Sequence, residues 1–134
     1  MKLAANILLI DDDPAILRLL ELSLTRAGHK VATAATWQQV IENINLTSQN
    51  RKTFDLIFLD LMMPERSGYD MLRSLKVILH PTPPVIVLTA LSGIDSAVKA
   101  LELGATKYLT KPISQDKLLN TVVEVLKGES SSRF

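Results

Sequence analysis

The sequence predicts an α/β domain in which five parallel strands form one sheet with helices on both faces. Short apolar runs, typical of strands buried on both faces, alternate five times with stretches whose apolar residues recur at helical spacing. Short links join these elements, which favours repeated strand–helix units in a single parallel sheet. With 134 residues, 47% of them hydrophobic, the chain has the size and apolar content of one compact domain.

The first half of the chain contains three predicted strands and two predicted helices. The strands are expected at residues 7–10, 30–34 and 56–59. Asp13 and Pro14 give the first helix an N-cap and a proline in its first turn, and Gly28 ends it. Thr36 caps the second helix, and the polar segment 46–53 is expected to be a loop.

The second half continues the same alternation. Its strands are expected at residues 85–88 and 108–110. One helix follows Gly68 and ends before Pro81, a second is closed by Gly104, and Ser114 caps the last. Residues 128–134 form a polar tail that has the composition of a linker start.

Composition excludes several classes of site. The net charge is +1, from 15 basic and 14 acidic residues, so no basic surface for nucleic acid is expected. The absence of cysteine excludes disulfides, thiolate nucleophiles and zinc–thiolate sites. No apolar run reaches membrane-spanning length and the N-terminus has no signal-peptide core, so we expect a cytoplasmic protein without membrane insertion.

Polar residues follow four of the five predicted strands at the point where each strand ends. They are Asp11, Asp12 and Asp13 after the first strand, Asp60 after the third, Thr89 at the fourth and Lys111 after the fifth. In an open parallel sheet, ligands bind beyond the carboxyl ends of the strands. We therefore expect these side chains to meet at one edge of the sheet.

The residue types predict a particular chemistry at that edge. Crowded carboxylates repel one another unless a cation joins them, and oxygen ligands without His or Cys favour Mg²⁺. A lysine supplies a second positive charge and a threonine hydroxyl a hydrogen bond. This combination suits phosphoryl transfer, which depends mostly on positioning and charge stabilisation.

Taken singly, the candidate residues have ordinary structural interpretations. Asp13 is expected to act only as a helix cap, Tyr108 to be a half-buried strand aromatic, and Trp37 to pack at a helix start. His29 and His80 are expected in loops away from the site. Only the recurrence of polar residues on successive strand ends favours a functional interpretation.

Four segments of the chain together closely resemble the response-regulator receiver family. They are residues 7–14 (ILLIDDDP), 54–64 (FDLIFLDLMMP), 87–90 (VLTA) and 108–112 (YLTKP). The resemblance covers about residues 5 to 127, and it implies a receiver domain at 1–127 followed by the tail. It also implies the flavodoxin-like fold with strand order 2-1-3-4-5.

The resemblance implies a role for each site residue. Asp60 would be the phosphoacceptor, Lys111 would pair with the phosphoryl group, and Thr89 and Tyr108 would form the conformational switch. The remaining implied features are Mg²⁺ held by Asp11, Asp12, Asp60 and the Met62 carbonyl, a small Ala90, and a cis bond between Lys111 and Pro112.

The resemblance also implies partners. The phosphoryl group would come from a phosphohistidine of a histidine kinase or phosphotransfer protein. The face formed by the fourth helix, fifth strand and fifth helix would then act on a downstream protein, a fused output domain or a second copy of the chain. The sequence leaves open whether the chain stands alone or forms part of a larger regulator.

Three features depart from common receivers. The segment between Asp12 and Asp60 is a few residues longer, most plausibly within 46–53. Thr106 and Lys107 stand where the winged-helix subfamily often has an acidic pair, which puts its dimer salt bridges in doubt. Met62 and Leu91 are apolar at positions that flank the path of hydrolytic water in the family, which predicts slow self-dephosphorylation.

Two alternatives stand beside this interpretation. In a haloacid-dehalogenase-type hydrolase, Asp11 would be the nucleophile and Asp13 the acid–base. That class needs a further acidic pair after the lysine, and the candidates are Asp116, Glu124 and Glu129. A degenerate receiver that only binds partners is the second alternative, although all five site residues are present.

Overall fold

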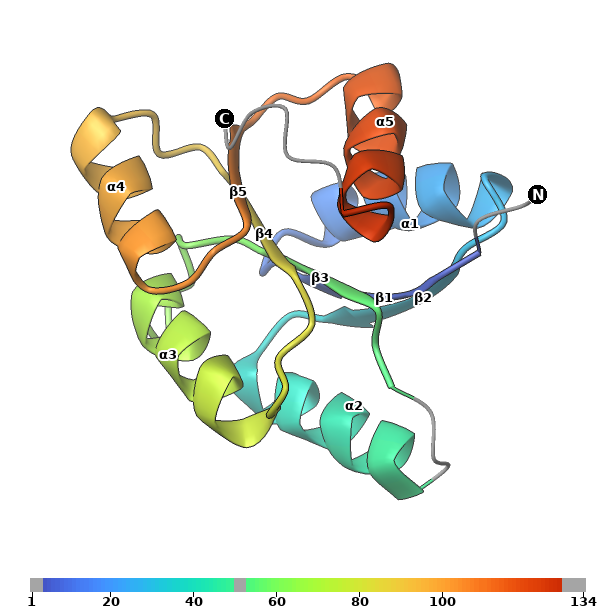
Figure 1. The fold of residues 1–134 in the computed structure, drawn as a ribbon, viewed down its shortest axis with the longest axis horizontal. Coiled ribbons are helices and arrows are strands. Elements are labelled where there is room, and N and C mark those ends of the chain that lie inside the picture. The colour runs from blue at the N-terminus through green and yellow to red at the C-terminus, as the bar shows by residue number, and fades with distance from the viewer. Residues whose placement is uncertain (1–3, 50–52, 129–134) are drawn as a thin grey trace.

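The computed structural model describes residues 4–49 and 53–128, and five strands alternate with five helices along them (Figure 1). The strands are β1 (Asn6–Ile10), β2 (Lys30–Ala34), β3 (Leu56–Leu59), β4 (Val85–Thr89) and β5 (Lys107–Thr110). The helices are α1 (Pro14–Arg26), α2 (Trp37–Gln49), α3 (Gly68–Ile78), α4 (Ile94–Glu102) and α5 (Gln115–Leu126).

All strand pairs are parallel, and the order in the sheet is β2-β1-β3-β4-β5. This confirms the predicted doubly wound α/β fold. The order reverses direction at β1, so the first strand has β2 on one side and β3 on the other. The loops after β1 and β3 therefore meet at the switch point, where ligands bind in open parallel sheets.

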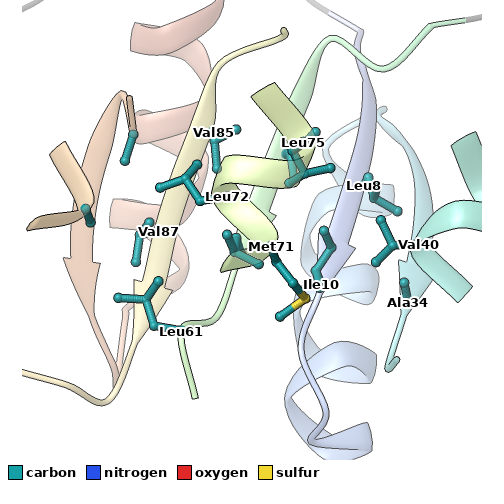
Figure 2. Close-up of a cluster of buried hydrophobic side chains, with 14 of the residues drawn as sticks. Leu8, Ile10, Ala34, Val40, Leu61, Met71, Leu72, Leu75, Val85 and Val87 are labelled. Carbon is teal, nitrogen blue, oxygen red and sulfur yellow. The ribbon is translucent and has the colours of Figure 1, made fainter. Parts of the chain in front are cut away.

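The two faces of the sheet carry separate hydrophobic cores. Alternate residues of β1 point to opposite faces, as the strand geometry requires: Leu8 and Ile10 to one, Ile7 and Leu9 to the other. The first core is covered by α2, α3 and α4, and the second by α1 and α5. In the first core, Met71, Leu72 and Leu75 of α3 are fully buried against the sheet (Figure 2).

Caps predicted from the sequence start the helices. Asp13 Oδ1 accepts hydrogen bonds from the N–H groups of Ala15 (2.9 Å) and Ile16 (3.4 Å). Ser114 Oγ accepts one from Lys117 N–H at 3.1 Å, and Thr36 Oγ1 one from Gln39 N–H at 3.2 Å. These bonds satisfy backbone donors that have no partner within the helix.

Four element boundaries differ from the prediction. Strand β1 begins one residue earlier, at Asn6, and β4 ends one residue later, at Thr89. The prediction of a loop at 46–53 was wrong for residues 46–49, because α2 runs to Gln49. These four residues include polar side chains, but they contain no Gly or Pro that would break the helix. Residues 50–52 and the predicted tail residues 129–134 lie outside the described part of the chain. Strand β5 begins at Lys107 rather than at Tyr108, and this lysine is buried because its ammonium group meets Glu124 at 2.9 Å.

None of the helices in residues 4–49 and 53–128 combines the length and apolar character needed to cross a bilayer.

Candidate functional site at the carboxyl edge of the sheet

The site forms where four neighbouring strands end at the same edge. Backbone hydrogen bonds continue the sheet pairing one residue beyond the strands: Asp60 N–H donates to the carbonyl of Ile10 at 2.9 Å, and Lys111 N–H to that of Thr89 at 2.8 Å. Asp11 N–H donates likewise to Ala34. The sheet itself therefore fixes the backbone of Asp11, Asp60 and Lys111, as site geometry requires.

Lys111 bridges the two buried carboxylates. Its Nζ donates to Asp60 Oδ2 at 2.8 Å and to Asp11 Oδ2 at 2.5 Å. The side chains of Asp11 and Asp60 are 5% and 6% exposed, and that of Lys111 is 16% exposed. The peptide bond between Lys111 and Pro112 is cis.

Burial and pairing shift the ionisation of this cluster. Burial raises the pKa of Asp11, and the opposing hydrogen bond from Lys111 does not fully offset it. Burial alone would lower the pKa of Lys111, but its hydrogen bonds to Asp11 and Asp60 outweigh that effect and raise it. Lys111 is therefore a permanent cation at neutral pH.

The carboxylates of Asp11, Asp12 and Asp60 can also share a cation. Each offers an oxygen that lies within 4.8 Å of the oxygens of the other two. Three carboxylates and the Lys111 ammonium leave two uncompensated negative charges, which a divalent ion would balance. The donors are all oxygens, which fits Mg²⁺. Met62 N–H donates to Asp60 Oδ1 at 2.9 Å, which holds the Met62 backbone beside this carboxylate.

Thr89 and Tyr108 lie on the neighbouring strands β4 and β5, and both contact Leu91. Thr89 is fully buried, and its Oγ1 accepts from Leu91 N–H at 3.4 Å. The Tyr108 hydroxyl donates to the Leu91 carbonyl at 2.7 Å. Tyr108 is buried rather than half-buried, because its ring joins the core beneath α4. Burial, with a smaller contribution from Tyr69, raises the pKa of Tyr108. Ala90, between Thr89 and Leu91, is exposed.

Other residues named from the sequence lie away from the site or serve the fold. His29 is buried and accepts a hydrogen bond from Ala5 N–H at its Nδ1, at the opposite edge of the sheet. His80 lies in the loop before β4. Trp37 begins α2 and packs beneath the guanidinium of Arg66, whose Cζ lies 4.8 Å from the ring centroid.

Gly68 supports the site, although the sequence predicted only a turn at this position. A Cβ at this position would lie 2.3 Å from Leu61 Cα and 2.9 Å from the Asp60 carbonyl oxygen. Its N–H donates to the Leu61 carbonyl at 3.1 Å. Only glycine permits this contact between α3 and the end of β3. In the sequence, a glycine eight residues after Asp60 gave only a turn signal.

Within residues 4–49 and 53–128, the structure does not supply the acidic pair that the hydrolase alternative requires. Asp13 is engaged as the N-cap of α1, and Glu124 pairs with Lys107. Asp116 lies in the first turn of α5, and among the described residues the one acidic cluster able to hold a metal is Asp11, Asp12 and Asp60. Glu129 lies outside the described residues.

Comparison with known proteins decides the family. The model of the response regulator receiver domain matches residues 7–123. The chain belongs to the response-regulator receiver family. Receivers are signalling domains of two-component systems, and a phosphoacceptor role is general among them; the comparisons give no support to the hydrolase alternative.

Individual relatives agree with this assignment. The chain is 38% identical to the transcriptional regulatory protein ZraR of Klebsiella oxytoca over 121 residues, which cover 90% of this chain and 26% of ZraR. It is 42% identical over 113 residues to the alginate biosynthesis transcriptional regulatory protein AlgB of Pseudomonas aeruginosa, covering 84% of this chain and 24% of AlgB. The receiver thus spans about a quarter of the length of these curated relatives.

A solved receiver has the same fold. The BeF3-activated receiver domain of DrrB is 33% identical, with a TM-score of 0.78. The match covers 93% of this chain and 99% of the DrrB domain. The similarity therefore extends over nearly the whole chain.

Proposed function

We propose that this receiver accepts a phosphoryl group on Asp60 from a phosphohistidine of a histidine kinase or phosphotransfer protein, with Mg²⁺ at the acidic cluster. The observation that supports this most strongly is the bridge from Lys111 to Asp60 and Asp11, beside the three-carboxylate cluster. A nucleophilic carboxylate, a fixed cation and a divalent-ion site together meet the needs of phosphoryl transfer.

The residues divide the reaction among them. An Asp60 carboxylate oxygen forms the new P–O bond as the P–N bond of the phosphohistidine breaks, and the imidazole leaves with the electron pair of that bond. Asp11, Asp12, Asp60 and the Met62 carbonyl would hold Mg²⁺, which neutralises charge on the phosphoryl oxygens when bound. Lys111 moves from the Asp60 carboxylate to a phosphoryl oxygen, and Thr89 donates its hydroxyl to another.

An apolar groove beside the site supports a protein as the phosphodonor. It has a volume of about 340 Å³, and Lys111 is one of its lining residues. Its other lining residues are Ile16, Leu19, Leu20, Leu88, Pro112 and Ile113. Leu19 is 62% exposed, so a donor that covered α1 and the start of α5 would bury apolar surface close to Asp60. A cytoplasmic location, compatible with the absence of cysteine, is part of the same proposal.

A second groove supports the α4–β5–α5 face as the output surface. It has a volume of about 570 Å³ and lies between the start of α4 and the turn from β5 to α5. Tyr108 and Ile94 both line it, and Ile94 is 81% exposed. Movement of Thr89 toward a phosphoryl group would release Leu91 N–H and change this groove. A downstream protein, a fused output domain or a second copy of the chain would sense that change.

Intact mass after incubation with acetyl phosphate and Mg²⁺ tests the proposal. The wild-type chain should gain the mass of one phosphoryl group, and Asp60→Asn or removal of Mg²⁺ by a chelator should abolish the gain. Asp13→Asn is the matched control, because Asp13 acts as a helix cap that Asn can replace. Equal labelling of wild type and Asp60→Asn would refute the assignment.

A further inference from the structure

Helix α4 is held to the sheet by little buried side-chain area. Its fully buried residues are Ala97 and Ala100, and Leu101 is partly buried against the core, whereas α3 fully buries Met71, Leu72 and Leu75. Gly93 stands at its N-cap and provides no side-chain hydrogen bond. Since apolar burial and capping are the main sources of helix stability in a domain, other contacts must contribute to the position of α4.

Tyr69, in the first turn of α3, provides such contacts. Its hydroxyl donates to the carbonyl of Ser96 at 3.3 Å. The ammonium of Lys99 lies 4.2 Å from the centroid of its ring, within the range of cation–π attraction. Ser96 and Lys99 are three residues apart and therefore lie on one face of α4. Tyr69 of α3 contacts both of them, and α3 and α4 are neighbours on the same face of the sheet (Figure 1).

The backbone of Tyr69 is tied to the phosphoacceptor strand. Its neighbour Gly68 donates its N–H to the Leu61 carbonyl and packs directly on the Leu61 backbone. Leu61 follows Asp60. A short series of contacts therefore links Asp60 through Leu61, Gly68 and Tyr69 to α4, in addition to the contacts of Thr89 and Tyr108.

Both tyrosines contact the start of α4 or the loop before it, and they lie close enough for Tyr69 to affect the ionisation of Tyr108. Tyr108 of β5 binds the Leu91 carbonyl, and Tyr69 of α3 binds the Ser96 carbonyl. We propose that Tyr69 is a positioning residue that retains α4 in the unphosphorylated receiver, and that its bonds to Ser96 and Lys99 must break before α4 can move. The movement of α4 on phosphorylation rests on the proposed function.

Hydrogen exchange in the unphosphorylated protein tests the retaining role. Tyr69→Phe removes only the hydroxyl, and loss of one net hydrogen bond should speed amide exchange in α4 by about fivefold. Lys99→Met removes the charge above the ring and should give a smaller increase. The matched control is Val77→Ala on α3, the helix that carries Tyr69, because the Val77 side chain is exposed (81%) and its loss should not affect α4. Unchanged exchange in α4, or equal acceleration in α4 and α5, would overturn the proposal.

Affinity for beryllofluoride in the presence of Mg²⁺ separates retention from ordinary support. If Tyr69 retains α4, Tyr69→Phe should bind this phosphoryl analogue up to about fivefold more tightly, because the competing conformation is less stable. Weaker binding in the variant would mean that Tyr69 only supports the site, and would refute its retaining role. Absence of binding to the wild type would count against the proposed function instead, and would leave the exchange result to decide the role of Tyr69.

Discussion

Replacing Gly68 with alanine adds only one methyl group, but we expect it to disturb Asp60, the proposed phosphoacceptor. The added Cβ would lie 2.3 Å from Leu61 Cα and 2.9 Å from the Asp60 carbonyl oxygen. Both are backbone atoms of the strand end, so no side chain can rotate away, and either α3 or the residues after Asp60 must move. Overpacking of this kind costs about 1–3 kcal/mol.

Urea unfolding and Mg²⁺ titration would measure this effect. We expect Gly68→Ala to lower the free energy of unfolding by about 1–3 kcal/mol and to weaken Mg²⁺ binding, since the displaced segment carries Asp60 and Met62. Gly93→Ser is the control: a Cβ there would meet only Ser96 Oγ, at 4.0 Å, and serine is a good N-cap. If Gly68→Ala matched the wild type in both measurements, the close packing at Leu61 would not support the site.

Three further predictions concern single side chains. The Met62 side chain is 51% exposed beside Asp60 and cannot orient water. Met62→Asn should therefore shorten the lifetime of the phosphorylated form by about tenfold, measured by loss of the phosphoryl mass with time. An unchanged lifetime would count against the prediction of slow self-dephosphorylation. Burial holds the pKa of His29 below its ordinary 6.5, so the unfolded chain binds the proton more readily than the folded one. The free energy of unfolding should therefore be highest above about pH 6.5 and decrease as the pH falls below it. In urea unfolding, His29→Asn should make this pH dependence less steep. Glu124→Gln leaves the buried Lys107 ammonium without a charged partner and should lower the melting temperature more than Lys107→Met does. The reverse order would show that Glu124 does not compensate the buried charge of Lys107.

The fold could be predicted from local signals almost throughout. The apolar runs gave the strands, and caps such as Asp13 and Ser114 gave the helix starts, because these signals depend on residues close in sequence. The start of β5 at Lys107 was not predicted, because a lysine is unexpected in a buried strand. Its charge is accommodated by Glu124, which lies on α5. Such a pairing depends on tertiary structure and gives no local signal.

In the site, too, the sequence predicted some residues, and others could be recognised only from the packed structure. The rule that ligands bind at the carboxyl ends of parallel strands brought Asp11, Asp60 and Lys111 together from the sequence. The contacts of Gly68 with Leu61 and of Tyr69 with α4 could not be predicted that way. Each depends on how α3 is set against the end of β3 and against α4, which only the packed structure shows.

The most direct test of the central claim is to locate the phosphoryl group itself. An acyl phosphate on an aspartate is reduced by borohydride to homoserine, so peptide mapping after phosphorylation and reduction identifies the modified residue. We expect homoserine at position 60, with Asp11 and Asp12 unmodified. Modification at Asp11, or a stable phosphate ester on a hydroxyl residue, would contradict it.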